Sequence, residues 1–119
     1  MEEIYIQDKI FDRENFLTKG EYENCSFNNC NLYDNDLSGF SFTNCTFIRC
    51  NLSLIKVNKA AFRDVKFKDC KMLGLRFDTC NQFGLSFSFD SCQLNHSSFY
   101  KAKSRLQYLI IASYMKRIL

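Results

Sequence analysis

The chain has 119 residues, of which 46% are hydrophobic and 24% charged, and its formal net charge is +3 at pH 7. This length suits one modest domain, and the apolar fraction is ordinary for a globular protein. We expect no secretory signal peptide, because the start Met1–Glu3 is acidic, and no apolar stretch is long enough to span a bilayer. We therefore expect a cytoplasmic protein without a membrane segment.

Residues 1–19 precede a repeat and are expected to form an N-terminal cap. They contain four large apolar side chains, Ile4, Ile6, Ile10 and Phe11. The terminal coil of a solenoid would otherwise leave one end of its core open to water, so solenoids need such caps. We expect these side chains to cover the N-terminal end of the core.

A five-residue period organises residues 20–103. The central position of each unit is apolar from Tyr22 to Phe99, except at Gln82, and a second inward position lies two residues earlier. The residue between them is nearly always polar, which gives each unit the inside–outside–inside alternation of a short strand. All seven cysteines fall on the earlier inward position: Cys25, Cys30, Cys45, Cys50, Cys70, Cys80 and Cys92.

The position two residues after each centre holds mostly Asn, Asp or Gly, as at Asn24, Asp34, Gly39 and also Thr79. A plain strand would point these polar residues inward, which is costly. Asn, Asp and Gly tolerate turn geometry, so we expect the chain to turn a corner there. Short strands that alternate with corners predict an all-β solenoid.

The units resemble those of the pentapeptide-repeat proteins, written loosely as Ala-Asp/Asn-Leu-x-x. Examples are Cys25–Ser26–Phe27, Cys30–Asn31–Leu32 and Cys50–Asn51–Leu52. The resemblance covers residues 20–102 and implies a right-handed quadrilateral β-helix of about four coils, with four units per coil. Residues twenty apart should then stack in columns. One column would contain Phe27, Phe47, Phe67 and Phe87, and the next Leu32, Leu52, Met72 and Leu94.

The period is interrupted by a two-residue insertion, which we place around Ser88, Phe89, Asp90 and Ser91. We expect one corner to bulge outward there, and these four residues are the candidate interaction residues, because loops on a regular scaffold often carry function. A tolerated surface bulge is the alternative interpretation. Gln82 and Ser97 are polar at inward positions, so each needs a partner or lies near a distorted coil.

The five-residue register stops at Ser104. Residues 104–119 have the apolar pattern of a short C-terminal α-helix, which should cap the last coil or mediate a homodimer. The tail can also be back-translated so that one inserted nucleotide after Lys103 restores the repeat in phase. This match is the basis for a further hypothesis, that residues 104–119 are a frameshift product of a longer repeat protein.

No catalytic, cofactor-binding or metal-binding site is predicted, and we expect a protein that is not an enzyme. His96 is the only histidine, and it falls at a corner without a recognisable nucleophile or carboxylate to pair with. Thiols in a column would point side by side into an apolar interior, whereas zinc needs ligands that converge tetrahedrally. We expect cysteine to act as a small apolar residue, with free thiols in a reducing cytoplasm.

Charge is distributed unevenly. Residues 1–36 hold nine acidic and three basic side chains, and residues 37–119 hold four acidic and thirteen basic ones. The basic side chains of the repeat fall on several predicted faces, so we expect no direct nucleic-acid partner.

The N-terminal part is similar to the quinolone-resistance (Qnr-type) members of the pentapeptide-repeat family. The similarity rests on Lys9–Ile10, Arg13 to Phe16, Glu23–Asn24 and Asn29–Cys30. Those relatives are dimers that imitate duplex DNA by shape and negative charge, and they bind and protect DNA gyrase or topoisomerase IV. The resemblance therefore implies a type II topoisomerase as the protein partner. The alternative is a structural or protein-interaction solenoid with an unknown partner.

Overall fold

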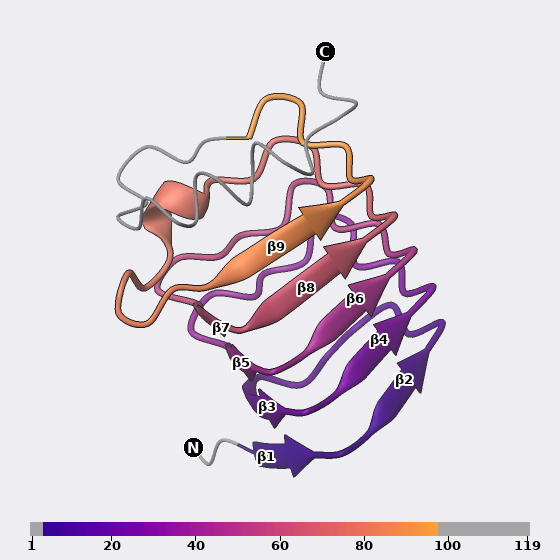
Figure 1. Ribbon diagram of the computed structural model, residues 1–119, viewed down its shortest axis with the longest axis vertical. Helices are drawn as coiled ribbons and strands as arrows, with labels where there is room; N and C mark the ends of the chain where they lie inside the picture. The colour runs from indigo at the N-terminus through magenta and orange to yellow at the C-terminus, as the bar shows by residue number, and fades with distance from the viewer. Residues whose placement is uncertain (1–3, 98–119) are drawn as a thin grey trace.

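The computed structural model describes residues 4–97, which wind into a stack of coils around one apolar core (Figure 1). Figure 1 shows β2, β4, β6, β8 and β9 lying one above another and pointing the same way. Two parallel sheets form two sides of the stack. The four-stranded sheet contains β1 (Ile4–Gln7), β3 (Gly20–Glu23), β5 (Ser41–Thr43) and β7 (Ala61–Arg63). The five-stranded sheet contains β2 (Ile10–Asp12), β4 (Ser26–Asn28), β6 (Thr46–Ile48), β8 (Val65–Lys68) and β9 (Phe87–Asp90).

The other two sides are held by single parallel bridges rather than by strands. Asn31, Asn51, Lys71 and Gln93 form one line of bridges, and Asp36 and Lys56 form another. The predicted all-β solenoid is therefore confirmed. The right-handed winding stays a prediction, and the expected tail helix at 104–119 lies outside the described residues. Within residues 4–97, no helix is long and apolar enough to cross a bilayer.

The core consists of stacked columns of buried rings. Phe27 and Phe47 have ring centroids 4.5 Å apart, and those of Phe47 and Phe67 are 5.3 Å apart, with nearly parallel planes in both pairs. The three residues pair across β4, β6 and β8, and each is at most 2% exposed. Full burial of a phenylalanine contributes about 1.5–3 kcal/mol, so such columns offset much of the entropy lost on folding.

The corners have the backbone conformation that the sequence indicates. Asn24, Asp34 and Gly39 lie in the left-handed region, with φ of 57°, 60° and 78°. Asn, Asp and Gly occupy this region at the least cost. The expected corner at Thr79 is wrong, because this residue lies in the 3₁₀-helix η1 (Phe77–Thr79). Leu54 is an unexpected member of the set, with φ of 61°.

The two-residue insertion lies earlier than predicted. Strand β9 pairs with β8 so that Phe87 is opposite Val65 and Phe89 is opposite Phe67. The rings of Phe67 and Phe89 are stacked with centroids 5.3 Å apart, so the predicted stacking of Phe87 on Phe67 is wrong.

Backbone hydrogen bonds show where the register changes. The Asn81 N–H donates to the Ala60 carbonyl, as expected for the regular repeat, whereas the Ser86 N–H donates to the Phe62 carbonyl. The shift therefore occurs between residues 81 and 86. Gln82 lies in this distorted segment, where its Nε2 donates to the Cys80 carbonyl at 3.1 Å and its Oε1 is buried without a hydrogen-bond partner.

The first coil packs directly on the repeat. Strands β1 and β2 pair with β3 and β4, and Ile4, Ile6 and Phe11 pack against the core. Ile10 is 75% exposed, so its expected place in a cap is wrong: it is paired with Ser26, whose side chain also faces outward. A Cβ added to Gly20 would lie 2.4 Å from the Ile4 carbonyl oxygen, so the close approach of the first two coils needs glycine here.

Candidate interaction surface

The four predicted interaction residues do not form a projecting loop. Ser88, Phe89 and Asp90 belong to β9, and Ser91 turns the corner after it with φ of 58°. Phe89 is fully buried because it continues the phenylalanine column, so it is not available to a partner. Asp90 and Ser91 are exposed, and their role in an interaction stays a prediction.

The cysteine thiols are committed to the interior. Cys50, Cys70 and Cys92 each donate a hydrogen bond to a carbonyl of the preceding coil, with Sγ–O distances of 3.2–3.3 Å to Phe27, Phe47 and Phe67. All seven cysteines are buried and free. Burial raises the pKa of Cys30, Cys45 and Cys80 to about 11, so these thiols are neutral at physiological pH. Among residues 4–97, no three potential metal ligands come together.

His96 lies at a corner, as expected, with φ of 63° and an exposed side chain. It belongs to the same line of corners as Asp34, Leu54 and Gly74, one from each successive coil. The sequence predicted no catalytic partner for this histidine. The line of corners itself is the more informative feature.

Leu54 breaks the rule that these corners follow. A non-glycine residue in the left-handed conformation costs about 1–2 kcal/mol, and Asn, Asp or Gly usually accept it. Leu54 is nevertheless 43% exposed, so little burial compensates for that cost. Its Cδ2 would lie 2.8 Å from a Cβ on Gly74, so glycine in the next coil lets the leucine extend over it. Sequence reasoning missed Leu54, although a lone apolar residue among polar corners was a visible signal.

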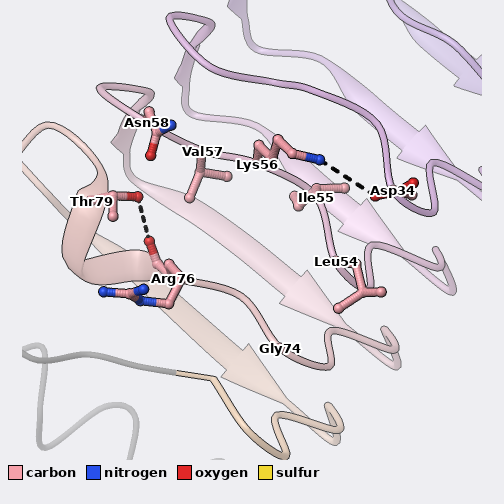
Figure 2. Close-up of a pocket in the computed structure, with 9 residues that line it drawn as sticks. All are labelled: Asp34, Leu54, Ile55, Lys56, Val57, Asn58, Gly74, Arg76 and Thr79. Atoms are coloured by element: carbon pink, nitrogen blue, oxygen red, sulfur yellow. Dashed lines mark hydrogen bonds and ion pairs between the residues drawn. The ribbon is translucent and has the colours of Figure 1, made fainter.

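One groove lies between residues 54–58 and residues 74–79, in two successive coils. It has a volume of about 380 Å³, and Figure 2 shows Lys56 and Val57 on one side with Arg76 and Thr79 on the other. Lys56 Nζ is 3.5 Å from Asp34 Oδ1, and the Arg76 guanidinium holds Asp78 through bonds of 2.8 and 3.0 Å. We call this space the rung groove.

A second groove lies on the other side of Leu54. It has a volume of about 320 Å³ and is lined by Tyr33, Leu54, Leu73 and the neighbouring Asn51 and Lys71. Tyr33 is 52% exposed, so this groove presents aromatic and aliphatic surface to solvent. We call it the apolar groove, and we call Leu54 together with the two grooves the Leu54 corner. Exposed apolar surface next to polar groups is typical of protein-binding sites.

The coils also differ in charge. Residues 20–39 carry four acidic side chains and no basic one: Glu21, Glu23, Asp34 and Asp36. Residues 40–59 carry three basic side chains and no acidic one: Arg49, Lys56 and Lys59. Hydrogen bonds from Ser38 hold the pKa of Asp36 below its usual range, so this carboxylate stays ionised at neutral pH. An acidic coil therefore lies directly against a basic one.

The fold and the corners define a four-sided β-solenoid built from five-residue units. A family model described as a pentapeptide repeat region matches residues 17–99, and the chain belongs to this family. No curated protein matches the chain significantly.

Two solved structures of trypsin-treated QnrB1 variants, described as a plasmid-mediated fluoroquinolone resistance protein, are similar to this chain. Their TM-scores are 0.43 and 0.41, with 20% and 21% sequence identity. The similarity covers 82% and 84% of this chain but only 56% and 57% of theirs, so the chain spans a little over half their length.

Proposed function

We propose that this chain is a non-enzymatic, protein-binding scaffold and that the Leu54 corner is its contact surface. The observation that carries the proposal is Leu54 itself, an exposed apolar side chain at φ of 61° between Asp34 and Gly74 in the same line of corners. A corner that only faces water has no use for this strained and apolar residue. Contact with a partner would bury the side chain and offset its cost.

For the partner, we propose a type II topoisomerase, either DNA gyrase or topoisomerase IV. Support comes from the resemblance of the N-terminal part to Qnr-type proteins and from the charge of the second coil. Duplex DNA carries one negative charge per about 1.7 Å, and successive strands lie about 4.8 Å apart, so a DNA mimic needs about three negative charges per coil. Residues 20–39, with four acidic and no basic side chains, meet this density.

A supercoiling assay with DNA gyrase and ciprofloxacin tests the choice of partner. We expect the chain to reduce inhibition by the drug, and the double variant Glu21→Gln, Asp36→Asn to lose the effect because it halves the acidic band. The double variant Lys66→Gln, Lys68→Gln, which changes exposed lysines of β8, should keep it. If the wild-type chain neither binds gyrase nor changes drug inhibition, the topoisomerase proposal is wrong.

The second candidate is a structural or interaction solenoid with a different protein partner. The basic third coil favours it, because residues 40–59 reverse the charge that mimicry of DNA requires. The two candidates differ in which coil matters. The double variant Arg49→Gln, Lys59→Gln should improve gyrase protection if the chain is a DNA mimic, and it should leave the gyrase assay unchanged under the second candidate.

Two further expectations stay proposals. We propose that the protein acts in the cytoplasm, where reducing conditions keep its thiols free. Self-association through residues 104–119, which lie outside the described part, remains the proposed route to a homodimer. Sedimentation equilibrium should give a dimer for the full chain and a monomer for a chain that ends at Lys103.

A further inference from the structure

The apolar groove exists because a small side chain lies between two large ones. Tyr33, Ser53 and Leu73 occupy equivalent positions in three successive coils, as the parallel bridges two residues before them show. Tyr33 is 52% exposed, whereas Ser53 is 3% exposed and lies at the bottom of the groove. The groove of about 320 Å³ is therefore a hollow on the scale of a large side chain.

The polar groups at the bottom of this hollow already have partners. The Ser53 N–H donates to Asn51 Oδ1 at 3.2 Å, and the Ser53 carbonyl accepts from the Asp34 N–H at 3.0 Å. The Ser53 hydroxyl accepts from the Leu73 N–H, also at 3.0 Å. No backbone pairing is therefore on offer here. What the hollow offers a ligand is the apolar side-chain surface of its walls.

A lysine without a carboxylate lies at the same groove. Lys71 lines the groove and is exposed, and it forms no ion pair with any other residue of 4–97. Its neighbours in the line of bridges, Asn51 and Gln93, are uncharged amides. At the rung groove, in contrast, both cations already face a carboxylate. Of the two grooves at the Leu54 corner, the apolar one is thus the groove that attracts an anionic ligand.

We propose that the apolar groove binds a short acidic segment of the partner protein, in which a leucine or phenylalanine side chain fills the hollow and a nearby carboxylate pairs with Lys71. Burial of a large apolar side chain contributes more than an exposed ion pair, so the apolar contact supplies most of the affinity. The ion pair selects acidic segments over neutral and basic ones. This inference rests on the proposed protein-binding function of the Leu54 corner and specifies the chemistry of the segment that binds there.

Amide NMR spectra of the full chain test the proposal with a capped peptide of sequence Ser-Phe-Ser-Glu-Ser as the probe. The Phe and Glu side chains of this peptide lie on the same side of an extended chain. We expect the Ser53 and Leu73 amides to shift on titration, and the amide of Phe67, in the sheet core, to stay unchanged. A probe with Gln in place of Glu should bind about threefold more weakly. A probe with Ala in place of Phe should bind about tenfold more weakly.

Two variants of the protein separate the two contacts. Lys71→Gln should bind the Glu and Gln probes equally, whereas Lys66→Gln, which removes an exposed lysine of β8, should keep the preference for Glu. Leu54→Asn should weaken the binding of every probe, because it removes part of the apolar wall at a corner where asparagine is tolerated. Phe83→Ala removes an exposed ring that does not line the groove and should leave binding unchanged.

Equal binding of the three probes to the wild-type chain, or no shift of the Ser53 and Leu73 amides, would overturn the proposal. A preference for the Glu probe that survives in Lys71→Gln would do the same. Shifts of these amides that follow protein concentration without any probe would also overturn it, by indicating a second copy as the occupant. The titration contains no topoisomerase, so its failure is distinguishable from failure of the supercoiling assay.

Discussion

The regular sheet around Phe47 keeps the five-residue repeat, whereas the coil that contains η1 departs from it. In the fourth coil, the Arg76 carbonyl does not accept a hydrogen bond from the Val57 N–H, and the chain takes two extra residues before β9. Yet the Phe67–Phe89 ring distance beyond this region is 5.3 Å, the same as the Phe47–Phe67 distance before it. The column of rings, rather than the number of residues per coil, therefore sets the register of the solenoid.

This difference predicts that stability is concentrated in the columns. Phe47→Ala should lower the free energy of unfolding by about 3–5 kcal/mol, because it leaves a cavity between two stacked rings. Phe83, in the distorted segment, is 80% exposed, and Phe83→Ala should change the free energy by no more than about 0.5 kcal/mol. Urea denaturation measures both. Similar losses in the two variants would contradict the comparison.

Alkaline pH should weaken the column of thiols. The pKa of Cys45 is raised to about 11 in the folded protein because the thiol is buried. The unfolded state loses this proton at lower pH, so the stabilising effect is complete below pH 9 and is lost as the pH rises to 11. We expect the wild-type chain to lose on the order of 2 kcal/mol more between pH 8 and 11 than Cys45→Ala. Equal pH dependence of the two chains in urea denaturation would refute this assignment.

The two inward polar residues should respond in opposite ways. Gln82→Leu should stabilise the chain by about 1 kcal/mol, because it removes a buried oxygen without a partner. Ser97→Ala should destabilise it by a similar amount, because the Ser97 hydroxyl donates to the Met72 carbonyl at 2.9 Å and accepts from the Leu75 N–H at 3.0 Å. Thermal denaturation gives both values. A destabilised Gln82→Leu would mean that the lost hydrogen bond from Nε2 to the Cys80 carbonyl outweighs the removal of the buried oxygen.

A small effect is expected at the Leu54 corner. Leu54→Asn should raise the free energy of unfolding by up to about 1 kcal/mol, since asparagine accepts the left-handed conformation more readily. The reverse exchange at the equivalent corner, Asp34→Leu, should lower it by a similar amount, because φ there is 60°. If Leu54→Asn is clearly destabilised, the leucine serves the fold, and its proposed role in binding loses its main support.

The sequence predicts the repeat because two of every five positions must be apolar and the corner residue must tolerate a positive φ. That is why the columns through Phe27, Phe47 and Phe67 and the partnered Ser97 were predictable. The position of the insertion was not, because Phe87 and Phe89 are both apolar and alternate inward. A shift of two residues keeps that alternation and leaves the hydrophobic pattern unchanged.

The candidate surface was less predictable than the fold. Corners were assigned to polar or glycine residues two positions after each centre, which left out the apolar Leu54 and wrongly included Thr79. The missing hydrogen bond between Val57 and Arg76 goes with the bonds that Arg76 makes to the Thr79 hydroxyl and the Asp78 carboxylate. A five-residue period does not encode such local hydrogen bonds. Departures from the repeat therefore mark the segments whose local structure depends on side-chain hydrogen bonds rather than on the five-residue period.

The register of the last strand tests the central claim most directly. In a spectrum that records contacts between ring protons, the account predicts cross-peaks that link Phe27 to Phe47, Phe47 to Phe67 and Phe67 to Phe89. A spectrum in which Phe67 contacts Phe87 instead, with Phe89 exposed in a loop, would contradict it.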